Sequence, residues 1–125
     1  MKNLLIAFTF LASLNSFAGA NCKELLNQYT EEKNYHTDLI IDANKKIEAV
    51  KQKVEQNQLN IERLSNSLKQ PDITHSKTRT LETIIDTYQD YIDYAPRIVL
   101  DIKQVVYDHA DELELLEDKV YSACN

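Results

Sequence analysis

The chain has 125 residues, with 14 basic and 20 acidic side chains and a formal net charge of −6. A chain of this length forms one domain with room for a modest hydrophobic core. The acidic balance disfavours nucleic acid and anionic lipid as partners, because binding to either one needs a basic stripe. The single glycine and the two prolines, in contrast, leave long uninterrupted helices as the expected fold class, which is all-α.

Residues 1–20 have the pattern of a secretory signal peptide. Lys2 supplies the positive charge, residues 4–14 form an apolar segment too short to span a bilayer, and residues 18–20 are small, as a cleavage site requires. An uncleaved membrane anchor is the alternative. We therefore expect a protein exported to the periplasm or secreted, with a mature chain of residues 21–125 that does not insert stably into a membrane.

The only two cysteines, Cys22 and Cys124, predict the topology. An exported chain with an even number of thiols is expected to pair them. The midpoint between them is residue 73, so a hairpin with two equal arms brings them together. If the chain reversed at Pro96 instead, Cys124 would lie on the order of 70 Å from Cys22, far beyond the reach of a disulfide. The sequence thus predicts a disulfide-clasped antiparallel helical hairpin that resembles a coiled coil.

The first arm is predicted to be one helix over residues 22–70. In the heptad notation abcdefg, a and d positions form the seam, which is the line of contact with the facing helix. One register runs through this arm without interruption, and eleven of its fourteen seam positions are apolar. Asn57 occupies a d position, where a buried amide can fix the register. The a positions are Leu26, Lys33, Ile40, Ile47, Val54, Ile61 and Leu68, and the d positions are Cys22, Tyr29, His36, Ala43, Val50, Asn57 and Leu64.

A turn over residues 71–76 and a second helix over residues 77–123 complete the hairpin. Pro71 cannot continue the first helix, and a threonine or serine after it can cap the second. Pro96 is expected to kink this helix rather than to end it. The second seam has a positions at Ile85, Ile92, Val99, Val106, Leu113 and Val120, and d positions at Leu81, Tyr88, Ala95, Ile102, His109, Leu116 and Ala123.

Polar residues within the seam are the candidates for a metal site. His36 and His109 both occupy d positions at nearly the same level of the hairpin, and Glu32 and Glu112 lie within one turn of them. Two histidines and two carboxylates on facing helices can hold a metal ion. Lys33, on the same turn, would repel a cation and could pair with Glu112 instead. We therefore favour a polar layer that sets the register, with no bound metal, over a metal site.

The second helix also carries apolar residues beside its seam, which make it wider than the face it would contact. We call this surface the side stripe and expect it to bind a protein partner or to form a homodimer, since tyrosine is favoured at interfaces. Residues 71–125 contain five basic and twelve acidic side chains, and we read their acidic outer face as a solvated surface, with docking of a basic partner as the alternative. The side stripe consists of Ile84, Tyr91, Tyr94, Ile98 and Val105.

The sequence lacks the patterns that carry catalysis. It has no glycine-rich phosphate loop, no serine or cysteine nucleophile beside a base, and no His-Glu-x-x-His motif. A pair of helices also offers little volume for a small-molecule pocket. We therefore expect no enzymatic activity and no cofactor. The function predicted is that of an exported protein-binding module, similar in role to a chaperone, adaptor or inhibitor, and the alternative is a small metal-binding protein.

Overall fold

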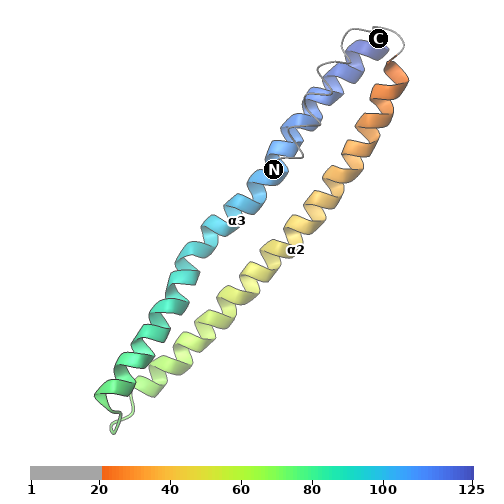
Figure 1. Ribbon diagram of the computed structural model, residues 1–125. Coiled ribbons are helices and arrows are strands. Elements are labelled where there is room, and N and C mark those ends of the chain that lie inside the picture. The colour runs from red at the N-terminus through yellow and green to blue at the C-terminus, as the bar shows by residue number, and fades with distance from the viewer. Residues whose placement is uncertain (1–20) are drawn as a thin grey trace. The chain divides into compact units, whose positions relative to one another are not determined.

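A computed structural model describes residues 21–125, and the predicted signal peptide lies outside this range. Two helices, α2 (Cys22–Leu68) and α3 (His75–Cys124), pack against each other and run antiparallel (Figure 1). A disulfide joins Cys22 to Cys124. The prediction of an all-α, disulfide-clasped antiparallel hairpin is therefore confirmed. Within residues 21–125, neither helix contains a stretch that is long and apolar enough to cross a membrane.

The turn between the helices lies two residues earlier in the chain than the sequence predicted. α2 ends at Leu68 rather than at residue 70, and α3 begins at His75 rather than at residue 77. Thr74 is the capping residue, because its Oγ1 accepts a hydrogen bond of 3.2 Å from the main-chain N–H of Lys77. This bond satisfies one of the free N–H groups at the start of α3, which explains why the helix begins directly after Thr74.

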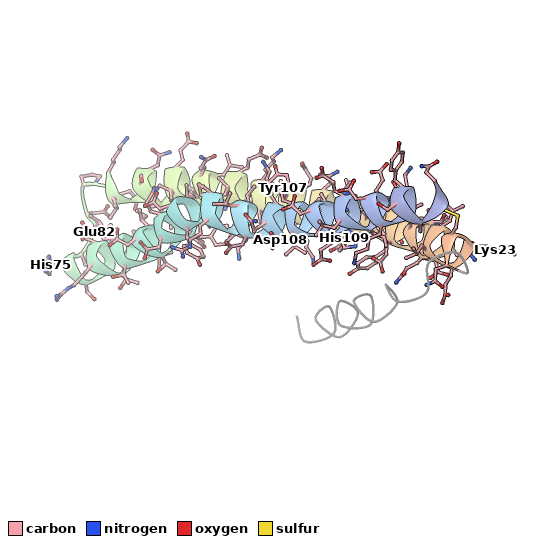
Figure 2. All side chains as sticks on the ribbon, turned by 90° about the horizontal axis from the view of Figure 1, so that it is seen from above. Lys23, His75, Glu82, Tyr107, Asp108 and His109 are labelled. Carbon is pink, nitrogen blue, oxygen red and sulfur yellow. A yellow bond between two sulfur atoms is a disulfide. The ribbon has the colours of Figure 1, made fainter. Side chains whose placement is uncertain are left out.

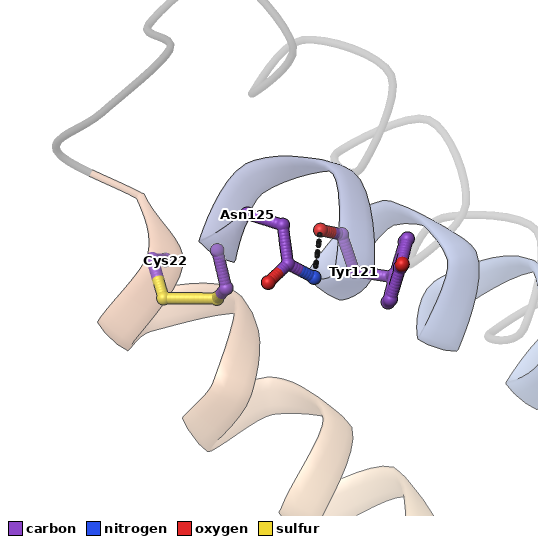
Figure 3. The surroundings of a disulfide bond; sticks show 4 residues. Cys22, Tyr121 and Asn125 are labelled. Atoms are coloured by element: carbon purple, nitrogen blue, oxygen red, sulfur yellow. Dashed lines mark hydrogen bonds between the residues drawn. A yellow bond between two sulfur atoms is a disulfide. The ribbon is translucent and has the colours of Figure 1, made fainter.

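The described residues form two compact units. The first contains residues 21–39 and 107–125, and the second contains residues 40–106 with the turn. In the first unit the disulfide holds the start of α2 to the end of α3, with 5.0 Å between the two Cα atoms. Beside it, the Nδ2 of Asn125 donates a hydrogen bond of 3.1 Å to the carbonyl oxygen of Tyr121, which caps the last turn of α3 (Figure 3).

The register predicted for α3 is present along the whole helix. Every predicted a and d position from Leu81 to Ala123 is buried or half-buried. Pro96 lies inside the helix, which is kinked there and continues to Cys124. A proline in this position has no N–H to donate to the carbonyl of Ile92, so one main-chain hydrogen bond is missing from the ladder of α3.

The uninterrupted register predicted for α2 is wrong. The predicted seam residues Leu26 and Ile40 are 47% and 40% exposed, and Lys33 is exposed as well. In their place, residues one position earlier face α3: Leu25 is buried, and Glu32 and Leu39 are half-buried. From Ala43 onward the predicted positions are buried or half-buried, including Asn57, which is 6% exposed.

The change of register takes place through two successive steps of four residues, from Leu39 to Ala43 and from Ala43 to Ile47. An element of eleven residues thus interrupts the heptads and locally unwinds the supercoil. The physical reason is the charge on Lys33. The heptad register would bury its ammonium group, whereas the observed register exposes it and brings the carboxylate of Glu32 toward α3.

The hydrophobic core is thin. Only four apolar residues of the described part are buried, with exposed fractions of 4–8%: Leu25, Ala43, Ala95 and Leu116. No large side chain there is fully buried, and twelve large apolar side chains are exposed. Two packed helices cannot cover all of their apolar surface, so part of it stays in contact with solvent.

Candidate functional site

A pair of histidines lies in the seam of the first unit, next to Glu32. The Nδ1 atoms of His36 and His109 are 2.9 Å apart, and their rings stack with centroids 5.1 Å apart and an angle of 15° between the planes. His109 is 3% exposed. The edge of the Tyr35 ring covers it, with 5.1 Å between the centroids, and α3 presents it next to Tyr107 and Asp108 (Figure 2).

The carboxylate of Glu32 determines the proton positions in this pair. Its Oε2 lies 3.0 Å from Nε2 of His109, and a carboxylate accepts, so Nε2 of His109 carries the proton. Nδ1 of a neutral His109 is then an acceptor, and Nδ1 of His36 must donate to it. The result is a directional chain of two hydrogen bonds from His36 through His109 to Glu32, in which both nitrogens of the buried ring are satisfied.

The arrangement differs from that of a metal site. Two histidine nitrogens that bind one tetrahedral zinc ion are about 3.3 Å apart with both lone pairs directed at the metal, whereas here one nitrogen donates to the other. Glu32 contacts the opposite nitrogen of His109, and no hydrogen bond or ion pair within residues 21–125 joins Glu112 to the pair. In that part of the chain, no group of three or more His, Cys, Asp or Glu side chains is placed to hold a metal ion.

Lys33 also lies elsewhere than expected. Its Nζ is 5.9 Å from the centroid of the Tyr29 ring, one turn earlier on the exposed side of α2, and it makes no ion pair with Glu112. The layer around His36 is therefore built from Glu32 and Tyr35 of α2 and from His109 of α3. Sequence reasoning missed the part played by Tyr35, for which spacing gave no signal because the residue points away from the predicted seam.

The side stripe lies in the second unit and is partly exposed. Ile84 is 38% exposed and Tyr94 and Val105 are each 54% exposed, whereas Tyr91 and Ile98 are half-buried. The Nζ of Lys53 lies 4.2 Å from the centroid of the Tyr91 ring, which is a close cation–π contact between the two helices. Since Lys53 and Tyr91 both occupy g positions, this contact shows that the g positions of the two helices share one side of the seam.

The opposite side of the seam carries an apolar depression with a volume of about 550 Å³, which we call the Pro96 groove. Lys51 and Glu55 border it with opposite charges, and they occupy e and b positions, as expected for the side away from the side stripe. The groove corrects the expectation that a helix pair has little volume for a pocket. Its apolar lining consists of Val50, Val54, Ile92, Ala95, Pro96 and Val99.

The cause of the groove is a local loss of side-chain volume on α3. Ala95 reaches only a short distance into the seam, and Pro96 replaces what would be a longer side chain beside it. The two valines of α2 that face them are also short. The pattern was visible in the sequence as an Ala-Pro pair at adjacent d and e positions, but small residues in a seam can also bring two helices closer together, so the pattern alone does not predict a cavity.

The third histidine, His75, lies outside the pair of His36 and His109. His75 begins α3, is exposed, and lies at the end of the second unit that carries the turn (Figure 2). The fold and these sites define the class of the molecule, a disulfide-clasped antiparallel helical hairpin with a polar layer in its first unit. The chain matches no protein-family model, no curated protein and no solved structure.

Proposed function

We propose that the protein is an exported, non-catalytic module that binds another protein through the side stripe. The observation that supports this most is the exposure of three large apolar residues of the side stripe, Ile84, Tyr94 and Val105, along one side of a helix pair with a thin core. The disulfide supports export, because such bonds persist in oxidising compartments.

The charges beside the side stripe favour a partner of one chemical type. Lys46 and Lys53 of α2 occupy g positions on the same side of the seam, and the side chain of Lys46 is 62% exposed although it pairs with Asp42 at 2.7 Å. A partner that meets both features has an apolar ridge with acidic residues along one margin. An amphipathic helix has this pattern when its apolar face carries a flanking row of Asp or Glu.

Site-specific photocrosslinking tests this proposal. A photoreactive residue at Val105 should form a covalent adduct with one protein of the compartment in which the chain resides. The same residue at Leu59, which is 56% exposed on the outer face of α2, should form none. Val105→Glu should abolish capture of that partner while the helical content is kept. Equal adducts at both positions, or capture that survives Val105→Glu, would show that the side stripe is not the binding surface.

The second candidate function is metal binding through Glu32, His36, His109 and Glu112. The observation in its favour is that the structure brings His36 and His109 together across the two helices in a partly buried layer, with Glu32 beside His109. It requires that Glu112 move toward the pair and that the existing hydrogen bond be given up. A calorimetric titration, described in the Discussion, separates this function from protein binding.

A further inference from the structure

Pro96, which lines the groove, belongs to a row of four residues along one side of α3. Asp93, Pro96, Leu100 and Lys103 occupy alternating b and e positions, on the side of the seam opposite the side stripe. Leu100 is 59% exposed one turn after Pro96, although it is one of the largest aliphatic side chains of the helix. A protruding apolar residue thus lies directly beside an apolar depression.

The spacing of this row is symmetric. The four residues follow one another at intervals of three, four and three, so the row reads the same in both directions around residue 98. When the row is read in the opposite direction, each residue is matched by one of complementary chemistry. The acid Asp93 corresponds to the base Lys103, and the groove at Pro96 corresponds to the protruding Leu100. A two-fold axis requires this property of an interface between identical chains, in which each contact occurs twice.

We propose that the Pro96 groove is the homodimer interface of this protein, with a second copy of the chain as its occupant. The two α3 helices lie antiparallel across a two-fold axis close to residue 98. Leu100 of each copy fills the Pro96 groove of the other, and Asp93 of each copy pairs with Lys103 of the other.

The exposure of these residues, the size of the groove and the position of the Asp93 carboxylate are all compatible with this contact. Asp93, Leu100 and Lys103 are all exposed in the single chain, so docking needs no rearrangement of the core. The groove is lined by six apolar residues and is large enough for a leucine side chain. Asp93 accepts a hydrogen bond of 2.9 Å from Nε2 of Gln89, which holds its carboxylate in place on the helix surface. The groove and the side stripe lie on opposite sides, so dimerisation leaves the side stripe free for another protein.

The first experiment measures the dimer. Sedimentation velocity on the purified oxidised protein over a concentration series should show a reversible monomer–dimer equilibrium. Leu100→Glu should raise the dissociation constant by at least about 100-fold, because each dimer loses two buried leucines and gains two desolvated carboxylates. Leu100→Ala should have a smaller effect in the same direction and preserves helix propensity. Leu59→Glu, on the outer face of α2, should leave the dissociation constant unchanged.

The second experiment identifies the occupant through charge. Asp93→Lys makes both charged positions of the row basic, and Lys103→Asp makes both acidic, so each variant alone should dimerise at least about tenfold more weakly. An equimolar mixture of the two should form a heterodimer tighter than either homodimer. The double variant Asp93→Lys/Lys103→Asp should dimerise as the unmodified protein does. Circular dichroism and melting curves verify that all variants are folded.

Three results would overturn the proposal. The first is a monomer at every concentration, since the groove would then be open or take a different partner. The second is a dimer that resists Leu100→Glu but is lost in Val105→Glu, which would place self-association on the side stripe. The third is a mixture of the two charge variants that forms no heterodimer. The first and third results leave partner capture through Val105 unaffected, so in those cases the homodimer fails while the proposed function stands. The second would mean that the side stripe binds a second copy of the chain, which photocrosslinking at Val105 would detect as an adduct of the chain with itself.

Discussion

The Nδ1 atoms of His36 and His109 lie 2.9 Å apart across the two helices, and Oε2 of Glu32 lies 3.0 Å from Nε2 of His109. Both nitrogens of the buried His109 ring therefore have a polar partner, as buried polar groups in native proteins require.

The double substitution His36→Leu/His109→Leu should raise the free energy of unfolding at pH 7 by on the order of 1 kcal/mol. Apolar replacement of a buried polar cluster is often stabilising, and Glu32, whose side chain is 39% exposed, can be hydrated once its partner is gone. Urea denaturation of the two proteins provides the comparison. A variant that is less stable than the native protein would contradict this prediction.

A calorimetric titration of the chelator-treated protein with Zn²⁺ or Cu²⁺ should show no submicromolar site. The nitrogens that would bind the metal are already joined by a hydrogen bond, and Glu32 contacts the far side of His109. His36→Leu/His109→Leu is the matched control for surface binding to the acidic face of α3. Submicromolar binding of one ion per chain that this variant removes would establish the metal-binding function instead.

Replacing both cysteines by serine should lower the free energy of unfolding by about 4–5 kcal/mol, since the disulfide closes a segment with a sequence separation of 102 residues. The helices should still form at low temperature, because the seam does not depend on the bond. Thermal and urea denaturation of the variant, and of the native protein with and without reductant, measure the loss. A loss below about 1 kcal/mol would indicate that the unfolded chain already keeps its two ends close together.

The architecture was predictable because several independent features of the sequence indicate the same fold. The register of α3 follows from thirteen seam positions that agree, and the cysteine positions admit one simple topology. The register at the start of α2 was ambiguous because apolar residues are adjacent there, as in Leu25-Leu26 and Leu39-Ile40. Spacing fits either member of such a pair, and only the cost of burying Lys33 distinguishes the two registers.

The candidate site was predictable in its location but not in its chemistry. Spacing placed His36 and His109 at one level, and the structure brings them into contact. It could not assign the donor and the acceptor, because this depends on Glu32, which reaches His109 only in the shifted register. The Pro96 groove was missed for a related reason. Sequence shows which side chains are small, whereas a depression depends on how closely the facing helix approaches them.

The turn and the disulfide together determine how the molecule responds to a protease. Lys69 is exposed just after α2, in the segment before Thr74 that leaves the backbone accessible to trypsin-like enzymes. Cleavage there would normally separate a hairpin into two peptides, but the bond between Cys22 and Cys124 keeps them in one covalent molecule. A cleaved chain should therefore migrate as one species on a non-reducing gel and as two species under reduction. The disulfide thus allows the two helices to stay together after the turn has been cut.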